Sequence, residues 1–155
     1  MSKYQTFGHA KTRIRYHLIF STKYRTRCLE DISDAVKDVF TTVEASSDFR
    51  LHAIGVDADH VHLVVSFRPN WAIAQIVRRL KQGSTHLLWE TQESHLQKFY
   101  WGTKKRLWTN GYFVETVGSV SEDKILEYVR DQGSRQPPLL SYAKLKTSHL
   151  SRNRT

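Results

Sequence analysis

The spacing of apolar residues along the chain predicts alternating strands and helices. β-Branched and aromatic residues dominate residues 12–22, 49–56, 60–68 and 112–117, which predicts four strands. Apolar residues recur every three or four positions in residues 32–43 and 71–89, and each stripe predicts an amphipathic helix, the first capped by Asp31. A last helix is expected to begin at Ser121 and to end at Gly133.

The order of these elements predicts the fold class. Strand, helix, strand, strand, helix, strand is the order of the ferredoxin-like split βαβ plan, here with one helix appended. We therefore predict an α+β fold with a four-stranded antiparallel sheet, whose first and third strands are central neighbours. One domain is expected over residues 1–133, with its core at about 12–133 and a loosely held polar start over residues 1–11. Residues 134–155 are expected to form a basic C-terminal extension.

Two histidines lie in the third predicted strand. His60 and His62 share one face of that strand because successive side chains point to opposite faces. Their backbones should be about 6.5–7 Å apart, which allows both imidazoles to approach one divalent cation. The alternative interpretation is an edge strand that carries two solvated histidines.

The last predicted helix carries two further candidates. Tyr128 and Gln132 are four residues apart and therefore share a helix face. The amide oxygen of Gln132 suits a hard cation, so it could be a third metal ligand beside His60 and His62. Alternatively, Tyr128 is a core aromatic residue and Gln132 a solvated residue of the last turn.

The charge of the 155-residue chain points to a polyanionic partner. A formal net charge of +9 attracts phosphate backbones, and aromatic residues, 12% of the chain, favour single strands, whose bases stack on rings. A basic protein without such a partner is the alternative. The candidate DNA-contacting residues are Arg13, Arg15, Arg78, Arg79, Lys81, Lys104, Lys105 and Arg106.

Composition also narrows the cellular setting. No apolar run reaches the roughly 18 residues of a membrane span and no signal-peptide pattern is present, so we expect a cytoplasmic protein. The single cysteine, Cys28, excludes a disulfide framework and a thiolate metal cluster.

A tyrosine near a metal-bound phosphate suggests a particular chemistry. A phenol has a pKa near 10 and is a weak nucleophile, but a cation on the scissile phosphate neutralises its charge and polarises phosphorus. Attack by Tyr128 would give a phosphotyrosine that a second DNA end can attack, so strands can be rejoined without ATP.

Four segments resemble the small single-tyrosine HUH transposases of bacterial and archaeal insertion sequences. They are residues 16–25 (YHLIFSTKYR), 59–65 (DHVHLVV), 108–118 (WTNGYFVETVG) and 128–132 (YVRDQ). The resemblance covers about residues 12–133. It implies a ferredoxin-like fold and the cleavage and joining of single-stranded DNA with Mg²⁺ or Mn²⁺, through a 5′-phosphotyrosine intermediate.

The resemblance also implies roles for individual residues. His60 and His62 would be the HUH histidines, Tyr128 the nucleophile and Gln132 the third ligand. Family members are homodimers that bind DNA hairpins at the element ends, often with the tyrosine helix serving the histidines of the partner. We therefore expect a homodimer, with Tyr128 acting in cis or in trans. The tail beyond Gly133 matches nothing in the family.

Three alternatives to a transposase remain. A domesticated relative could use the same chemistry on repeated palindromic DNA. A non-catalytic module that binds single-stranded nucleic acid would need exposed aromatic residues on the central strands. A hydrolytic metal enzyme is the weakest alternative, because no Asp or Glu shares the strand face of His60 and His62 as a general base.

Overall fold

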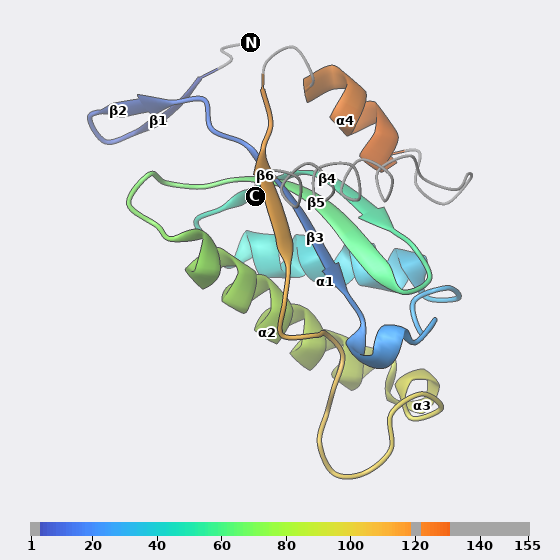
Figure 1. Cartoon of the computed structure of the whole chain (residues 1–155). Coiled ribbons are helices and arrows are strands. Elements are labelled where there is room, and N and C mark those ends of the chain that lie inside the picture. The colour runs from blue at the N-terminus through green and yellow to red at the C-terminus, as the bar shows by residue number, and fades with distance from the viewer. Residues whose placement is uncertain (1–3, 119–121, 131–155) are drawn as a thin grey trace, which may run out of the picture.

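The computed structural model describes residues 4–118 and 122–130, without the side chains of Glu122 and Tyr128. The elements of the chain are, in order, β1 (Gln5–Phe7), β2 (Ala10–Thr12), β3 (Tyr16–Ser21), η1 (Lys23–Arg25), α1 (Ser33–Ala45), β4 (Arg50–Val56), β5 (His60–Ser66), α2 (Ile73–Thr91), α3 (Glu93–Leu96), β6 (Phe113–Thr116) and α4 (Glu122–Arg130) (Figure 1).

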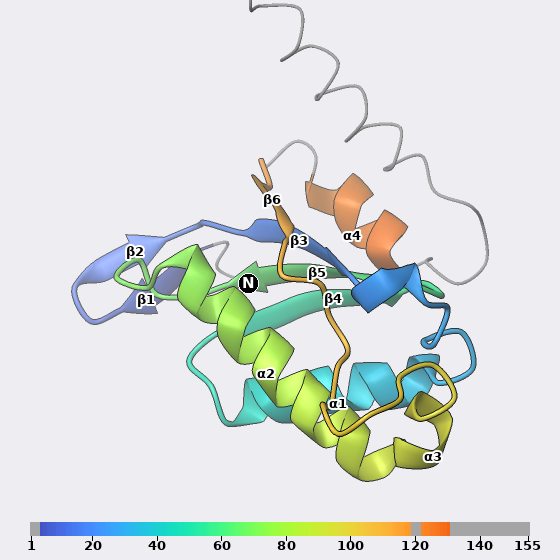
Figure 2. The same cartoon turned by 60° about the horizontal axis from the view of Figure 1, so that its bottom comes forward.

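The main sheet has the topology that the element order predicts. Its four strands are antiparallel and lie in the order β4-β5-β3-β6, so β3 and β5 are the central pair. Helices α1 and α2 cover one face of the sheet, and α4 lies over the other face (Figure 2). The predicted ferredoxin-like α+β fold with one appended helix is therefore confirmed.

Strand β5 is buried along its whole length, because both faces of the sheet are covered. Val61, Leu63 and Val65 point into the main core beneath α1 and α2. The alternate residues His60, His62 and Val64 face the side of α4. The central position of β5 excludes the alternative of two solvated histidines on an edge strand.

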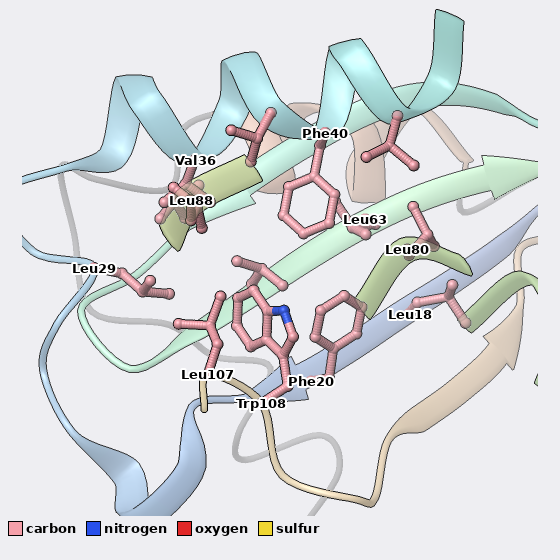
Figure 3. Close-up of a cluster of buried hydrophobic side chains, with 14 of the residues drawn as sticks. Leu18, Phe20, Leu29, Val36, Phe40, Leu63, Leu80, Leu88, Leu107 and Trp108 are labelled. Carbon is pink, nitrogen blue, oxygen red and sulfur yellow. The ribbon is translucent and has the colours of Figure 1, made fainter. Parts of the chain in front are cut away.

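The main core includes a residue from the long connection between α3 and β6. The indole of Trp108 contacts Phe20 edge-on, with ring centroids 4.8 Å apart (Figure 3). Its Nε1 donates a hydrogen bond to Oγ of Ser84 at 2.9 Å. Leu107 beside it is also buried. These contacts hold the connection against α2 and β3.

The structure corrects three of the predicted details. Residues 5–12 form the hairpin β1–β2, with Gly8 at a φ of 57° in the turn, so this segment is ordered by backbone pairing that a polar sequence does not reveal. Strand β3 consequently begins at Tyr16 rather than at residue 12. The α1 helix is preceded by Ile32 and has no side-chain cap, so the prediction for Asp31 is wrong. Ser121 and Gly133 lie outside the described residues.

None of the helices in residues 4–118 and 122–130 is long and apolar enough to cross a membrane.

The contact between α1 and α2 depends on a glycine. A Cβ placed on Gly83 of α2 would lie 2.7 Å from Cγ2 and 3.1 Å from Cγ1 of Val43 on α1. Val43 is buried, and a β-branched side chain in a helix has one preferred rotamer, so neither methyl group can easily move away. The close approach of the two helices therefore excludes a larger residue at position 83.

We expect the substitution Gly83→Ala to lower the free energy of unfolding by about 1 kcal/mol. Overpacking costs about 1–3 kcal/mol, which exceeds the gain of about 1 kcal/mol from replacing a glycine inside a helix. Urea denaturation followed by circular dichroism measures this change. In a Val43→Ala background the same substitution should instead stabilise the protein, and stabilisation in the wild-type background would contradict the close packing.

Candidate functional site

The two histidines of β5 lie side by side on the face of the sheet that α4 covers. Their ring centroids are 4.9 Å apart and the rings are inclined by 65°. Both side chains are nearly inaccessible, with His60 5% and His62 2% exposed. Directly across from His62 on β4 is Gly55, which has no side chain to fill the adjacent space.

His62 is held by His17 of β3, which in turn contacts Glu115 of β6. Nδ1 of His62 lies 3.1 Å from Nε2 of His17, and Nδ1 of His17 lies 3.2 Å from Oε1 of Glu115. The strand register explains this row. His17 pairs with Glu115 on β6 and with Val64 on β5, two residues from His62 on the same face.

His60 is oriented by the turn that precedes β5. Nδ1 of His60 lies 2.7 Å from Oδ1 of Asp59, and Nε of Arg25 donates a hydrogen bond to Oδ2 of the same carboxylate at 3.2 Å. On the other side of the ring, Oδ2 of Asp57 lies 3.7 Å from Nε2 of His60. Arg25 and its neighbour Tyr24 have left-handed backbone conformations, with φ of 53° and 62°.

Burial favours the neutral forms of His62 and His17. Burial, reinforced by the neighbouring His17 and His60, lowers the pKa of His62 to about 2. Burial also lowers the pKa of His17, and this effect outweighs the opposite influence of Glu115. Burial alone would raise the pKa of Asp59, but the hydrogen bond from His60 and the charge of Arg25 lower it overall. Neutral imidazoles are the form that binds metal ions.

The donor set fits a divalent cation. Nε2 of His60 is buried and makes no hydrogen bond to any described residue, which is the environment expected of a ligand atom. In His62 the bond to His17 uses Nδ1, so Nε2 is the nitrogen that could coordinate. Among residues 4–118 and 122–130, no group of three His, Cys, Asp or Glu side chains is arranged to hold a metal. The predicted third ligand, Gln132, lies outside the described residues.

The appended helix packs on the face of the sheet that carries the histidines. Val129 of α4 is fully buried against Ala53 and Val64, with Ile125 and Leu126 beside it. Val64 lies on the same face of β5 as His62. Tyr128 precedes Val129 in α4, so the structure places its backbone over this face, although its side chain lies outside the described part of the chain.

His17, Glu115 and Asp59 belong to the site but were not predicted from the sequence. His17 lies in an apolar strand and Glu115 in a short one, and 98 residues separate them along the chain. Only the pairing of β3 with both neighbours brings them together. Asp59 is next to His60 in the sequence, so the carboxylate–histidine pair that orients a metal ligand could have been anticipated.

The candidate DNA-contacting residues are divided among several places. Arg79 bonds Oγ of Ser47 and the carbonyl of Ser46 at the end of α1, at 2.7 and 2.6 Å. Nζ of Lys81 donates to the carbonyls of Thr109 and Gly111, so it holds the connection before β6. Arg13 and Arg15 lie between β2 and β3, and Lys104 lies between α3 and β6.

Several of these cations line a groove between α2 and the segment before β6. The groove has a volume of about 740 Å³ and lies on the α2 side of the sheet. Its basic lining consists of Lys23, Arg78, Lys81, His86, Lys105 and Arg106. This basic groove is the largest concentration of predicted DNA-contacting residues in the described part of the chain.

Fold and site together define a ferredoxin-like α+β protein with a pair of buried histidines on its central strand. The family model for IS200-like transposases matches residues 10–132, and the chain belongs to this family. The predicted resemblance to insertion-sequence transposases is therefore confirmed.

Individual relatives agree with this assignment. The ISDra2 transposase TnpA of Deinococcus radiodurans is 29% identical over 125 residues, which are 80% of this chain and 87% of the relative. The transposase for insertion sequence element IS200 of Salmonella typhimurium is 26% identical over 133 residues, 85% of each chain.

Two solved structures share the fold. A transposase candidate from Deinococcus radiodurans R1 superposes with a TM-score of 0.64 and 29% identity, over 84% of this chain and 100% of the other. A REP-associated tyrosine transposase bound to a REP hairpin has a TM-score of 0.55 and 14% identity, over 83% of this chain and 70% of the other, which shows a shared fold alone.

The buried neutral state of His62 predicts a loss of stability in mild acid. Its folded pKa lies below the unfolded value of 6.5, so the unfolded chain binds the additional proton and stability falls as pH drops below 6.5. Between pH 7 and pH 5 this single group should cost about 2 kcal/mol of unfolding free energy.

Urea denaturation at both pH values, with a chelator present, measures this loss. The variant His62→Gln removes the titrating group and should lose about 2 kcal/mol less than the wild type over the same interval. Equal losses in the two proteins would show that His62 does not stay neutral on folding.

Proposed function

We propose that this transposase cleaves and rejoins single-stranded DNA through a phosphotyrosine formed on Tyr128. The observation that carries the proposal is the pair of buried imidazoles on the face of the sheet over which the helix of Tyr128 packs. A scissile phosphate held beside the histidines would lie beneath the element that bears the nucleophile.

We assign His60 and His62 as ligands of Mg²⁺ or Mn²⁺, with Gln132 as the third. The bound cation would neutralise the scissile phosphate and polarise its phosphorus. Asp59 holds the ring of His60, and His17 holds the ring of His62, so both imidazoles would meet the cation in fixed orientations. The α1–α2 side of the sheet takes no part in this chemistry.

The proposed reaction is a phosphoryl transfer in two steps. In the first, Oη of Tyr128 forms a bond to phosphorus, the bond to the 3′ oxygen breaks, the phenol loses its proton and the leaving oxygen gains one. The strand is left with a 3′ hydroxyl and a 5′-phosphotyrosine. In the second, a 3′ hydroxyl attacks the phosphotyrosine, restores a phosphodiester and returns the phenol. No step consumes ATP, because the number of ester bonds to phosphorus is conserved.

We propose DNA hairpins at element ends as the substrate, and the basic groove as part of the surface that binds them. The groove lies on the opposite side of the sheet from the histidines, so DNA could be held there while a single strand reaches the histidine face. Its cations would contact phosphates and would contribute affinity without base specificity. We also propose that the protein is a homodimer, in which Tyr128 acts with the histidines of its own subunit or of the partner subunit.

The alternatives are less well supported. A non-catalytic sheet binder would present aromatic residues on the face of the central strands that lies away from α1 and α2, where this chain has His17, Ile19 and His62. A domesticated relative acting on repeated palindromic DNA would use the same residues and chemistry, so it differs only in substrate.

The substitution Tyr128→Phe should abolish covalent attachment to DNA. The variant lacks the attacking oxygen but retains the ring, so hairpin binding should change less than about twofold. The measurement is incubation with a labelled single strand from an element end and Mn²⁺, followed by denaturing electrophoresis. The matched variant Tyr4→Phe removes a hydroxyl from an exposed tyrosine outside the site and should retain attachment. Attachment by Tyr128→Phe at the wild-type level would exclude Tyr128 as the nucleophile.

Removing two cations from the basic groove should weaken hairpin binding and reduce its salt dependence. Loss of two phosphate contacts in Arg78→Ala/Lys105→Ala should make the slope of log affinity against log salt shallower by about 1.5. Fluorescence anisotropy at several salt concentrations measures this slope. The control Arg27→Ala/Arg50→Ala makes the same change in net charge at residues outside the groove lining. Equal slopes for both double variants would show that the groove does not contact phosphates.

A further inference from the structure

We propose that Glu115 and His17 form a relay that determines which ring nitrogen of His62 carries the proton. The relay places that proton on Nδ1 and leaves the lone pair of Nε2 for the metal ion. The inference rests on the proposed function, since it assigns His62 as a metal ligand. His17 and Glu115 act through His62 and are therefore positioning residues.

The direction of the relay follows from the chemistry of its members. An ionised carboxylate only accepts hydrogen bonds, so Nδ1 of His17 must donate to Oε1 of Glu115, at 3.2 Å. A neutral imidazole has one N–H, which leaves Nε2 of His17 as an acceptor. The contact of 3.1 Å between Nε2 of His17 and Nδ1 of His62 is then donated by His62. The neutral ring of His62 consequently has its lone pair on Nε2.

The hydrogen bond of His60 runs in the same direction as that of His62, with Nδ1–H as the donor. Oδ1 of Asp59 lies 2.7 Å from Nδ1 of His60, so Nδ1–H donates a hydrogen bond to the carboxylate, and the neutral form of this ring has its lone pair on Nε2. Nε2 is therefore the nitrogen that each of the two histidines would offer to a metal ion. In both cases Nδ1 begins a series of hydrogen bonds that ends at a carboxylate. His60 reaches its carboxylate directly, whereas His62 reaches one through an intermediate ring.

The sheet explains why His17 is needed. Glu115 lies on β6, two strands from β5, and each strand step is about 4.8 Å, so β3 and the side chain of His17 lie between Glu115 and His62. The ring of His17 spans the gap and stacks near that of His62, with centroids 5.3 Å apart and an interplanar angle of 19°. His17 is fully buried and the side chain of Glu115 is 14% exposed, so water competes little for these bonds.

The variant Glu115→Gln tests the direction of these hydrogen bonds, because glutamine has almost the same shape as glutamate. A glutamine amide can donate to Nδ1 of His17, which turns His17 into the donor toward His62 and moves the proton of His62 to Nε2. Multiple-bond ¹⁵N–¹H correlation spectra of the metal-free protein report the tautomer. We expect the Nδ1–H tautomer in the wild type and a substantial Nε2–H population in the variant. Mn²⁺ affinity, followed by electron paramagnetic resonance, should fall 10- to 100-fold.

Two further variants separate the relay from a general effect on structure. His17→Gln retains a carbonyl oxygen that can accept from Nδ1 of His62, so it should keep more Mn²⁺ affinity than His17→Leu, which has no acceptor. Glu30→Gln changes an exposed carboxylate that pairs with Arg27 and should leave both tautomer and affinity unchanged. Thermal denaturation checks that each variant folds.

The outcomes are distinct for the relay and for the proposed function. An Nε2–H tautomer of His62 in the metal-free wild type, or an unchanged tautomer and Mn²⁺ affinity in folded Glu115→Gln and His17→Leu, would overturn the relay. Covalent attachment by Tyr128→Phe would instead overturn the proposed function. Even if the proposed function is overturned, the tautomer of His62 measured in the metal-free protein still tests the relay.

Discussion

The pairing of β3 with β5 on one side and with β6 on the other positions the whole candidate site. This register places Glu115, His17 and Val64 in one row across the sheet, with His62 one row away on the same face. A slip of one residue would turn His17 toward the core and remove the support of His62. The register is in turn held by apolar residues such as Leu18 and Leu63, which pair with each other and fill the core on the opposite face.

The two faces of the sheet differ in composition and in function. The face under α1 and α2 is apolar and close-packed, as the contact of Gly83 with Val43 shows. The other face carries three buried histidine rings, which would lower stability if they lacked partners. Carboxylates at Asp59 and Glu115 provide those partners, and the resulting network also sets the direction in which His60 and His62 face. Burial, usually a cost for polar groups, here favours the neutral imidazole of His62, which is the form that binds a metal ion.

The positive charge of the chain is likewise used in more than one way. Lys81 and Arg79 bond backbone carbonyls and hold connections in place, so part of the net charge of +9 is structural. Arg25 supports the carboxylate that orients His60. Arg78 and Lys105 line the basic groove without such a hydrogen bond among those described, and they are the cations best placed to bind phosphate.

The sequence alone was sufficient for the fold and for the family. Alternating and three-to-four spacings of apolar residues are local properties, and they gave the order of the elements of the main sheet and of α1 and α2. The H-x-H pattern of His60 and His62 is also local, because two residues apart on a strand always share a face. The hairpin β1–β2 was missed because its strands are short and its apolar pattern is weak.

Only the tertiary structure decided which residues support His62. His17 and Glu115 are far from His62 along the chain, and their roles arise from strand order and register, which no local pattern encodes. The same is true of Lys81 and Arg79, whose side chains could have been solvated but reach carbonyl groups of neighbouring segments. Local sequence determined what each element is, and long-range packing determined which side chains meet, because contacts between distant residues depend on how the elements are placed in space.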